Sequence, residues 1–526
     1  MEQRPKFYLT TAIFYPSPRP ALHSLFEAIG ADVLARYRRL EGRETRFLTG
    51  LDEHSANVER DAREQGIAPQ ALIDPWADTW REIFDRFAIS YDRFIRTTDA
   101  DHARAASEMV RRAMAAGDVY KGTYSGWFCT GCNEFKTEAQ LIDGRCPDHP
   151  TLDPQWLEED NYFFALSRYQ EQLERLYAEQ PDFCQPEHFR NEVLGWLREG
   201  LRDFSISRSG AAWGIPFPDD PAHRIYVWFD ALTNYLTGTG FPDDPAAYAR
   251  WWPADVHVIG KNITRFHCLY WPAMLLSAGL PLPRQVFAHG FMLARGRKMS
   301  KTEGNFLDPD RMADLFGVDG IRYVVLREVP FDRDADVSLD AFVRRYNADL
   351  ANDFGNLLNR TLSMTSRFLD GERPPPAPTA ESALGAAWAE AWRVYAERLD
   401  AFLLHEALAA LWGFVGDANR FVDSEQPWVL AKAAREGDAQ ASERLRHSLG
   451  DLLEACRLVG LAVAPFLPTT APRVAAQLGY DYPYGPAGEG GPPLAELAGW
   501  GAGGAGGHVG QAHILFPRLE TKAEPA

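Results

Sequence analysis

The 526-residue chain has no apolar run that approaches the roughly 20 residues needed to cross a bilayer. Residues 1–6 are mostly polar or charged and contain no apolar signal core. Six cysteines are too few for a disulfide scaffold in a chain of this length. A formal net charge of -18 argues against broad nonspecific nucleic-acid binding, although it permits a local basic surface. These absences predict a cytoplasmic protein without a membrane partner.

The composition that remains is that of an ordinary globular protein, with 46% hydrophobic and 24% charged residues, and the length predicts several domains. Residues 7–14 are apolar, aromatic and β-branched, which predicts a buried strand. Three prolines make residues 15–20 a loop, and apolar residues at helical spacing follow from Leu22 to Tyr37. This order of strand, loop and helix predicts a nucleotide-binding α/β domain, with ligand phosphates near the helix N-terminus.

Further strands are predicted at residues 46–50, 225–230, 256–260 and 286–290, with helices beginning near 231 and 266. Asp52 follows the second strand, where acidic side chains are site candidates in such sheets. A helix N-cap is an equally good interpretation of Asp52 taken alone. Aromatic residues near these strands fit either an apolar pocket or the core.

The segment from Arg297 to Asn305 places Lys298 and Lys301 three residues apart, with Ser300 between them. Two ammonium groups on a short loop suit a polyphosphate, because they neutralise the charge that develops as pyrophosphate leaves. The plainer alternative is an exposed basic loop. The choice depends on what the rest of the chain places opposite the two lysines.

Three of the six cysteines cluster in residues 117–162, which have the character of an insertion. Cys129 and Cys132 form one pair, and Cys146 and His149 follow after thirteen intervening residues. This spacing is typical of a Cys3His zinc knuckle, and four protein ligands without an open position indicate a structural metal. Unrelated buried thiols are the weaker alternative.

From residue 339 the pattern becomes helical, with an apolar stripe that includes Phe342, Tyr346, Leu350 and Phe354. Ala- and Leu-rich segments over 382–478 predict an antiparallel helical bundle. Residues 481–507 are rich in Gly and Pro and are expected to be irregular.

Together these motifs resemble the methionyl-tRNA synthetases, a class I aminoacyl-tRNA synthetase family, over nearly the whole chain. The lysine loop, the zinc-knuckle residues and the segments 226–231 and 260–267 all match the family pattern. The resemblance implies an α/β fold: a Rossmann-type catalytic domain with a zinc-knuckle insertion, followed by a helical-bundle domain of the anticodon-binding kind. The expected boundaries are 1–116 and 223–338 for the catalytic halves, 117–222 for the insertion with its knuckle at 129–149, 339–480 for the bundle, and 481–526 for a Gly/Pro-rich C-terminal segment.

The resemblance also implies site residues, ATP with Mg²⁺ as reactant, a structural Zn²⁺, and methionine and tRNA(Met) as partners. The amino-acid site would comprise Ile13, Tyr15, Asp52, Trp228, Ala231, Leu232, Tyr235, Ile263 and His267, with Asp52 on the substrate ammonium. The ATP site would comprise His23, Ser24, Gly260, Asn262, Lys298 and Lys301, with Lys298, Ser300 and Lys301 catalytic. The anticodon would be read by Asn356, Arg360 and Trp428, and zinc would be held by Cys129, Cys132, Cys146 and His149.

The chain departs from the family at the His-x-Gly-His signature that opens the first helix. Ala21-Leu22-His23-Ser24 stands there, so both expected histidines and the glycine are replaced. Losing one such transition-state donor typically costs about 2.7–4 kcal/mol. In addition, Asn262 stands where a carboxylate is expected near the ribose, and Ser55 stands where glycine is usual.

Three hypotheses follow from this mixture. The first is a methionine–tRNA ligase with a divergent ATP site. The second is a related enzyme that activates an amino acid for a small-molecule acceptor, such as a hydroxylamine in N–N bond formation. The third is a non-catalytic protein that binds tRNA or an amino acid. The lysines argue against the third, the anticodon positions favour the first, and the altered signature favours the second. We rank the first ahead.

Overall fold

The computed structural model describes residues 5–130, 134–136, 138–147, 152–294, 296–298 and 307–520. A six-stranded parallel sheet lies at the centre, in the order β3-β2-β1-β12-β13-β7. Its strands are β3 (Arg93–Arg96), β2 (Glu44–Leu51), β1 (Lys6–Phe14), β12 (Val256–Gly260), β13 (Val286–His289) and β7 (Cys184–Gln185). The strands expected near residues 7–14, 46–50, 256–260 and 286–290 are confirmed, and their parallel order is that of a Rossmann-type domain.

Both faces of this sheet are buried, and the alternation of side chains along each strand decides which core each residue joins. Leu9 and Phe47 point to one face, and their neighbours Tyr8 and Leu48 point to the other. The first face is covered by α1 (Leu22–Leu40) and α12 (Val318–Glu328), and its core continues into the C-terminal helices. The second is covered by α4 (Ala100–Ala115), α8 (Asn234–Thr237) and α10 (Trp271–Ser277). The helical bundle therefore shares one continuous core with the central sheet.

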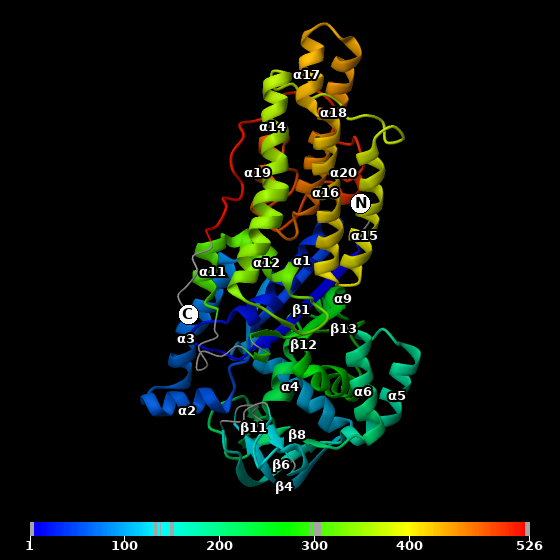
Figure 1. Ribbon diagram of the computed structural model, residues 1–526. Coiled ribbons are helices and arrows are strands. Elements are labelled where there is room, and N and C mark those ends of the chain that lie inside the picture. The colour runs from blue at the N-terminus through cyan, green and yellow to red at the C-terminus, as the bar shows by residue number, and fades with distance from the viewer. Residues whose placement is uncertain are drawn as a thin grey trace.

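The segment between the two halves of the sheet forms a separate antiparallel sheet at the opposite end from the bundle (Figure 1). Its long pair is β4 (Val119–Cys129) with β6 (Gln155–Phe164), flanked by β5 (Glu134–Lys136) and β8 (Phe204–Ser205). Helix α5 (Gln170–Glu179) leads into β7 at the edge of the central sheet, and α6 (Glu187–Glu199) follows β7. The chain enters the central sheet again at β12.

The strand predicted at residues 225–230 is wrong. The strand β11 (Asp220–Ile225) ends where the prediction began, and α7 (Val227–Leu232) follows at once. The apolar, aromatic run favours a strand by local preference, but the antiparallel pairing of β11 with β9 (Ser207–Arg208) extends only to Ile225. One further backbone bond, from Tyr226 N–H to Ile206 O, lies just beyond it. Buried packing on the second face of the sheet then overrides the β-preference of the run.

The C-terminal half is helical and rises above the sheet as a bundle (Figure 1). The helices expected after residue 339 are confirmed; they are α13 (Leu339–Arg345), the π-helical η6 (Tyr346–Gly355), α14 (Asn356–Phe368), α15 (Ala383–Asp400), α16 (Leu404–Glu425), α17 (Pro427–Arg435), α18 (Ala439–Ala462) and α19 (Thr470–Leu478). All four residues of the predicted stripe at 342–354 are buried. Residues 481–520 then run back along the molecule with one short helix, α20 (Leu494–Leu497).

Within the described ranges, every helix is too short or too polar to cross a lipid bilayer.

Candidate active site

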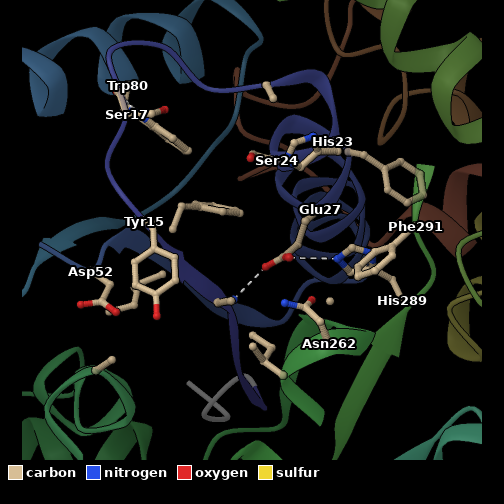
Figure 2. A pocket seen from close by; sticks show the side chains of 18 of the residues that line it. Tyr15, Ser17, His23, Ser24, Glu27, Asp52, Trp80, Asn262, His289 and Phe291 are labelled. Atoms are coloured by element: carbon tan, nitrogen blue, oxygen red, sulfur yellow. Dashed lines mark hydrogen bonds and ion pairs between the residues drawn. The ribbon is translucent and has the colours of Figure 1, made fainter. Parts of the chain in front are cut away.

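A cavity of about 690 Å³ opens at the carboxyl ends of β1, β2, β12 and β13. It lies where the strand order reverses between β1 and β12, which is where open parallel sheets bind ligands. Figure 2 shows Tyr15 and Asp52 on one side of the cavity, and Glu27, His289 and Asn262 on the other. His23 and Ser24, from the start of α1, lie beside that second group.

One end of the cavity is aromatic. Trp228 stacks on Phe266 with ring centroids 3.6 Å apart and planes 7° apart. Tyr235 and His267 also line this end, and both are buried. The stacked pair comes from α7 and from η4 (Phe266–Tyr270), so two separate helical segments must pack to build this wall.

The hydrogen bonds of His267 fix its tautomer. Its Nδ1 lies 3.0 Å from the carbonyl oxygen of Ile263, which can only accept, so Nδ1 carries the proton. Its Nε2 is then the acceptor for the Tyr235 hydroxyl at 2.6 Å. Burial lowers the pKa of His267 to about 4, which agrees with a neutral ring. The His267 ring and the Tyr235 hydroxyl are satisfied by each other or by backbone, whereas Trp228 Nε1 has no hydrogen-bond partner among the described residues. Apart from that indole N–H, the ring faces make this end suitable for an apolar ligand group.

Asp52, which follows β2, also lines the cavity. Its backbone N–H donates to Phe14 O at 2.8 Å, and its side chain is 3% exposed. Among the described residues, its Oδ1 has no hydrogen-bond partner. Burial, reinforced by the nearby Asp230 carboxylate, raises the pKa of Asp52 well above its usual range. A buried carboxyl with an open oxygen is a ready partner for a ligand cation.

The alternative reading of Asp52 as a helix N-cap is wrong. The N-cap of α2 (Ala56–Gln65) is Ser55, whose hydroxyl accepts from Val58 N–H at 3.3 Å. Ser55 therefore has a local structural role, and Asp52 is left to the cavity.

Near Asp52, the buried carboxylate of Asp230 pairs with two imidazoles. Asp230 accepts from His54 at 2.6 Å and from His102 at 2.7 Å. Burial alone would raise the pKa of Asp230, but the two histidines hold it below its usual value. His102 also contacts Thr237 at 3.1 Å, so this network joins α4, α7 and α8 behind the pocket. Sequence reasoning did not include any of these three side chains in the site.

The side of the cavity where the sequence predicts ATP is built on the N-terminus of α1. Ala21 is the N-cap residue and makes no side-chain cap, and its carbonyl accepts from Ser24 N–H at 3.0 Å. Ala21, His23 and Ser24 all line the cavity, together with Gly260 and Asn262 from the end of β12. A Cβ added at Gly260 would lie 2.9 Å from Asn262 Oδ1, so the Asn262 amide would have to shift. Four of the six residues expected at the ATP site, His23, Ser24, Gly260 and Asn262, are therefore brought together.

Glu27 and His289 also line this side and were not predicted as site residues. Glu27 Oε1 accepts from Ala12 N–H at 2.8 Å, and its Oε2 lies 2.9 Å from His289 Nε2. This contact links α1, β1 and β13, as the dashed lines in Figure 2 show. The signal in the sequence was a carboxylate one helical turn after Ser24, between the apolar residues Phe26 and Ala28.

The family model described as tRNA synthetases class I (M) matches residues 7–153 and 151–362. The methionine–tRNA ligase of Mycobacterium tuberculosis is 46% identical over 479 residues, covering 90% of this chain and 92% of that protein. That of Caldanaerobacter subterraneus is 41% identical, covering 99% and 80%. The chain belongs to the methionyl-tRNA synthetase family. A solved structure of the Mycobacterium tuberculosis synthetase in complex with methionyl-adenylate matches with a TM-score of 0.91 and 43% identity, covering 98% of this chain and 100% of that one.

Membership of the methionyl-tRNA synthetase family agrees with the fold expected from the sequence. The nine residues assigned to the amino-acid site by resemblance all line the cavity described above. They are Ile13, Tyr15, Asp52, Trp228, Ala231, Leu232, Tyr235, Ile263 and His267. Their individual roles stay predictions.

The lysine loop falls mostly outside the described residues. Lys298 ends the short strand β15 (Arg297–Lys298), which pairs with β14 (Met292–Ala294) beside the cavity. Ser300 and Lys301 lie in the part of the chain that is not described.

The three anticodon candidates lie in the bundle. Asn356 and Arg360 are one turn apart on α14, and Trp428 is 45% exposed at the start of α17. Arg360 donates to Asp423 of α16 at 3.1 Å. Helices α14 and α17, which carry these residues, contact each other in the bundle.

Of the four zinc candidates, Cys129 and Cys146 are buried, whereas Cys132 and His149 lie outside the described residues. No group of three or more potential metal ligands occurs among the residues that are described. The zinc site stays a prediction.

Proposed function

We propose that this protein activates methionine with ATP and transfers the methionyl group to tRNA(Met). The observation that carries this proposal is the pairing, in one cavity, of an apolar aromatic end with the buried, open carboxyl of Asp52. An unbranched, polarizable thioether suits the aromatic end, and its α-ammonium suits Asp52. The likeness to synthetases named as methionine–tRNA ligases supports the same substrate.

In the activation step, an oxygen of the methionine carboxylate forms a bond to the α-phosphorus of ATP. The bond from that phosphorus to the bridging oxygen breaks, and pyrophosphate leaves with the electron pair. The N-terminus of α1, which carries Ala21, His23 and Ser24, faces the cavity, and helix N-termini attract phosphate charge. Gly260 and Asn262, which line the cavity, are proposed to contact the ribose. Lys298, Ser300 and Lys301, with Mg²⁺, are proposed to neutralise the leaving pyrophosphate.

In the transfer step, the terminal ribose hydroxyl of tRNA attacks the methionyl carbonyl and AMP leaves. Asn356, Arg360 and Trp428 are proposed to bind the anticodon, since an amide, a guanidinium and an exposed indole suit unstacked loop bases. The relatives named above are tRNA ligases and give no support to a small-molecule acceptor or a non-catalytic role.

A structural Zn²⁺ held by Cys129, Cys132, Cys146 and His149 is part of the proposal, because this donor set suits tetrahedral zinc. Metal analysis of the purified protein and of its Cys129→Ser variant tests it.

The direct test of the proposed function is ATP–pyrophosphate exchange over a panel of amino acids, followed by charging of initiator and elongator methionine tRNA. We expect exchange with methionine alone and charging of both tRNAs. Methionine-dependent exchange without charging would contradict the tRNA acceptor, and the absence of exchange with every amino acid would contradict activation.

The pKa of Asp52 gives this site a distinctive pH dependence. The methionine ammonium would pair with the ionised carboxylate of Asp52. Burial raises the pKa of this carboxyl in the protein without ligand. Below that pKa the Asp52 carboxyl must release its proton before it can pair with the ammonium. The affinity for methionine therefore falls by up to about tenfold per pH unit. We expect the KM for methionine to rise as the pH falls through this value.

Asp52→Asn is expected to raise the KM for methionine and to flatten its pH dependence. Asp61→Asn, an exposed carboxylate on the neighbouring helix α2, is the matched control and should behave as the unmodified protein. A pH profile unchanged by Asp52→Asn would place the ammonium elsewhere.

A further inference from the structure

Arg19 is the only lysine or arginine among the described residues that line the cavity. It lies in the loop between β1 and α1, two residues before Ala21. Its carbonyl accepts from the Ser17 hydroxyl at 2.8 Å, and Ser17 O accepts from Trp80 Nε1 at 3.0 Å. Prolines at positions 18 and 20 restrict the backbone on both sides of Arg19. Arg19 therefore lies on a firmly held loop that lines the cavity.

The partner that the structure shows for Arg19 is Asp310, near the start of α11 (Pro309–Phe316). Asp310 also accepts from Arg86, which in turn donates to Asp314 at 2.5 Å. If the Arg19 guanidinium binds another anion, the Asp310 carboxylate still pairs with Arg86. The Arg19 side chain is 51% exposed, and such exposed ion pairs are weakly held. Breaking the Arg19–Asp310 ion pair therefore costs little free energy when a ligand anion binds Arg19.

The charge balance of the cavity indicates what that ligand is. Two carboxyl groups, Glu27 and Asp52, line the cavity, and the helix positions 21 and 24 carry Ala and Ser in place of imidazoles. A triphosphate bound here needs positive charge beside the N-terminus of α1. A guanidinium binds phosphate oxygens through two parallel N–H donors, in the manner of an arginine finger.

We propose that Arg19 is a catalytic residue that binds the β- and γ-phosphates of ATP and stabilises the leaving pyrophosphate, in the role that the altered signature no longer fills. The inference rests on the proposed activation of methionine. As the α-phosphorus–oxygen bond breaks, the electron pair moves onto pyrophosphate, and Arg19 pairs with that added negative charge. No proton moves in this step.

The test compares Arg19→Ala and Arg19→Lys with the unmodified protein in methionine-dependent ATP–pyrophosphate exchange. Arg19→Ala is expected to lower kcat about 10²-fold or more, with the KM for methionine unchanged, and Arg19→Lys is expected to recover part of the loss. Arg104→Ala is the matched control. Arg104 lies on α4, is about as exposed as Arg19, and pairs with a single aspartate, Asp243. It should exchange at the unmodified rate.

Asp310→Asn separates catalysis from a structural ion pair. If Arg19 only tethers the loop to α11, Asp310→Asn will lower exchange as far as Arg19→Ala does. If Arg19 binds phosphate, Asp310→Asn will retain exchange, since the guanidinium remains. Equal losses in the two variants, or exchange by Arg19→Ala within about twofold of the unmodified protein, would overturn the inference.

Calorimetry of ATP, pyrophosphate and adenosine tests the same inference without turnover. Arg19→Ala is expected to weaken binding of ATP and of pyrophosphate about tenfold or more and to leave adenosine binding unchanged. If the unmodified protein exchanges with no amino acid, the proposed function fails, and the calorimetry still decides the role of Arg19. Equal binding of all three ligands by both proteins would refute it.

Discussion

The triple substitution Ala21→His, His23→Gly and Ser24→His is expected to raise the rate of methionine-dependent ATP–pyrophosphate exchange by about 10²-fold. The three positions lie at the N-terminus of α1 and line the nucleotide side of the cavity. Two imidazoles placed there would donate to phosphate oxygens as charge builds in the transition state, and glycine would remove the His23 side chain from the adenine. A single donor of this kind is worth about 10²–10³ in rate. The expected rate increase is smaller than two such donors would give together, because Arg19 is proposed to supply part of the positive charge at the phosphates.

The control for this experiment is a double-mutant cycle with Arg19→Ala. If Arg19 and the restored histidines act on the same phosphates, removing Arg19 will cost less in the triple variant than in the unmodified protein. A triple variant that neither binds ATP more tightly nor turns over faster would show that residues 21–24 do not form the phosphate site.

Arg322→Met is expected to lower the free energy of unfolding by about 3–5 kcal/mol, because it leaves a buried carboxylate without a main partner. Arg322 lies on α12 with no exposed surface and donates to Asp32 Oδ2 at 2.6 Å. It also donates to three backbone carbonyls, those of Phe87, Pro465 and Phe466. This one side chain therefore joins the catalytic domain to the turn after α18, and urea unfolding followed by tryptophan fluorescence measures its contribution.

The pH dependence of this network has a definite sign. Burial alone would raise the pKa of Asp32, but Arg36 and Arg322 lower it to about 2. The stabilisation is present above the ordinary aspartate pKa and is lost as the pH falls through the lowered value. The difference between Arg322→Met and the unmodified protein should therefore be constant at neutral pH and shrink only in strong acid.

Arg393→Ala serves as the matched control for Arg322→Met. Arg393 also pairs with carboxylates, Glu390 and Glu397, but on the exposed face of α15. Its removal should leave the unfolding midpoint almost unchanged, since exposed ion pairs in high dielectric contribute little. A loss as large as that of Arg322→Met would mean that burial is not what makes the Arg322 network strong.

Local patterns in the sequence were sufficient for the sheet strands at residues 7–14 and 46–50 and for the helices after residue 339. Each of these is an apolar run whose period of two, or of 3.6, is set by the burial of one or both faces. The run at 225–230 shows the limit of that reasoning, because its aromatic residues prefer a strand locally and form a helix in the packed protein. There the surrounding core, and not the backbone preference, decides.

The sequence by itself determined the family, the two halves of the catalytic sheet and the positions at which the signature is altered, because these are properties of residue order and spacing. Only the tertiary structure decided the contacts between residues far apart in the chain. The Glu27–His289 pair spans 262 positions and the Arg19–Asp310 pair spans 291. Periodicity extends over a few helical turns, whereas these pairs depend on the order of strands in the sheet and on the packing of helices across its edge.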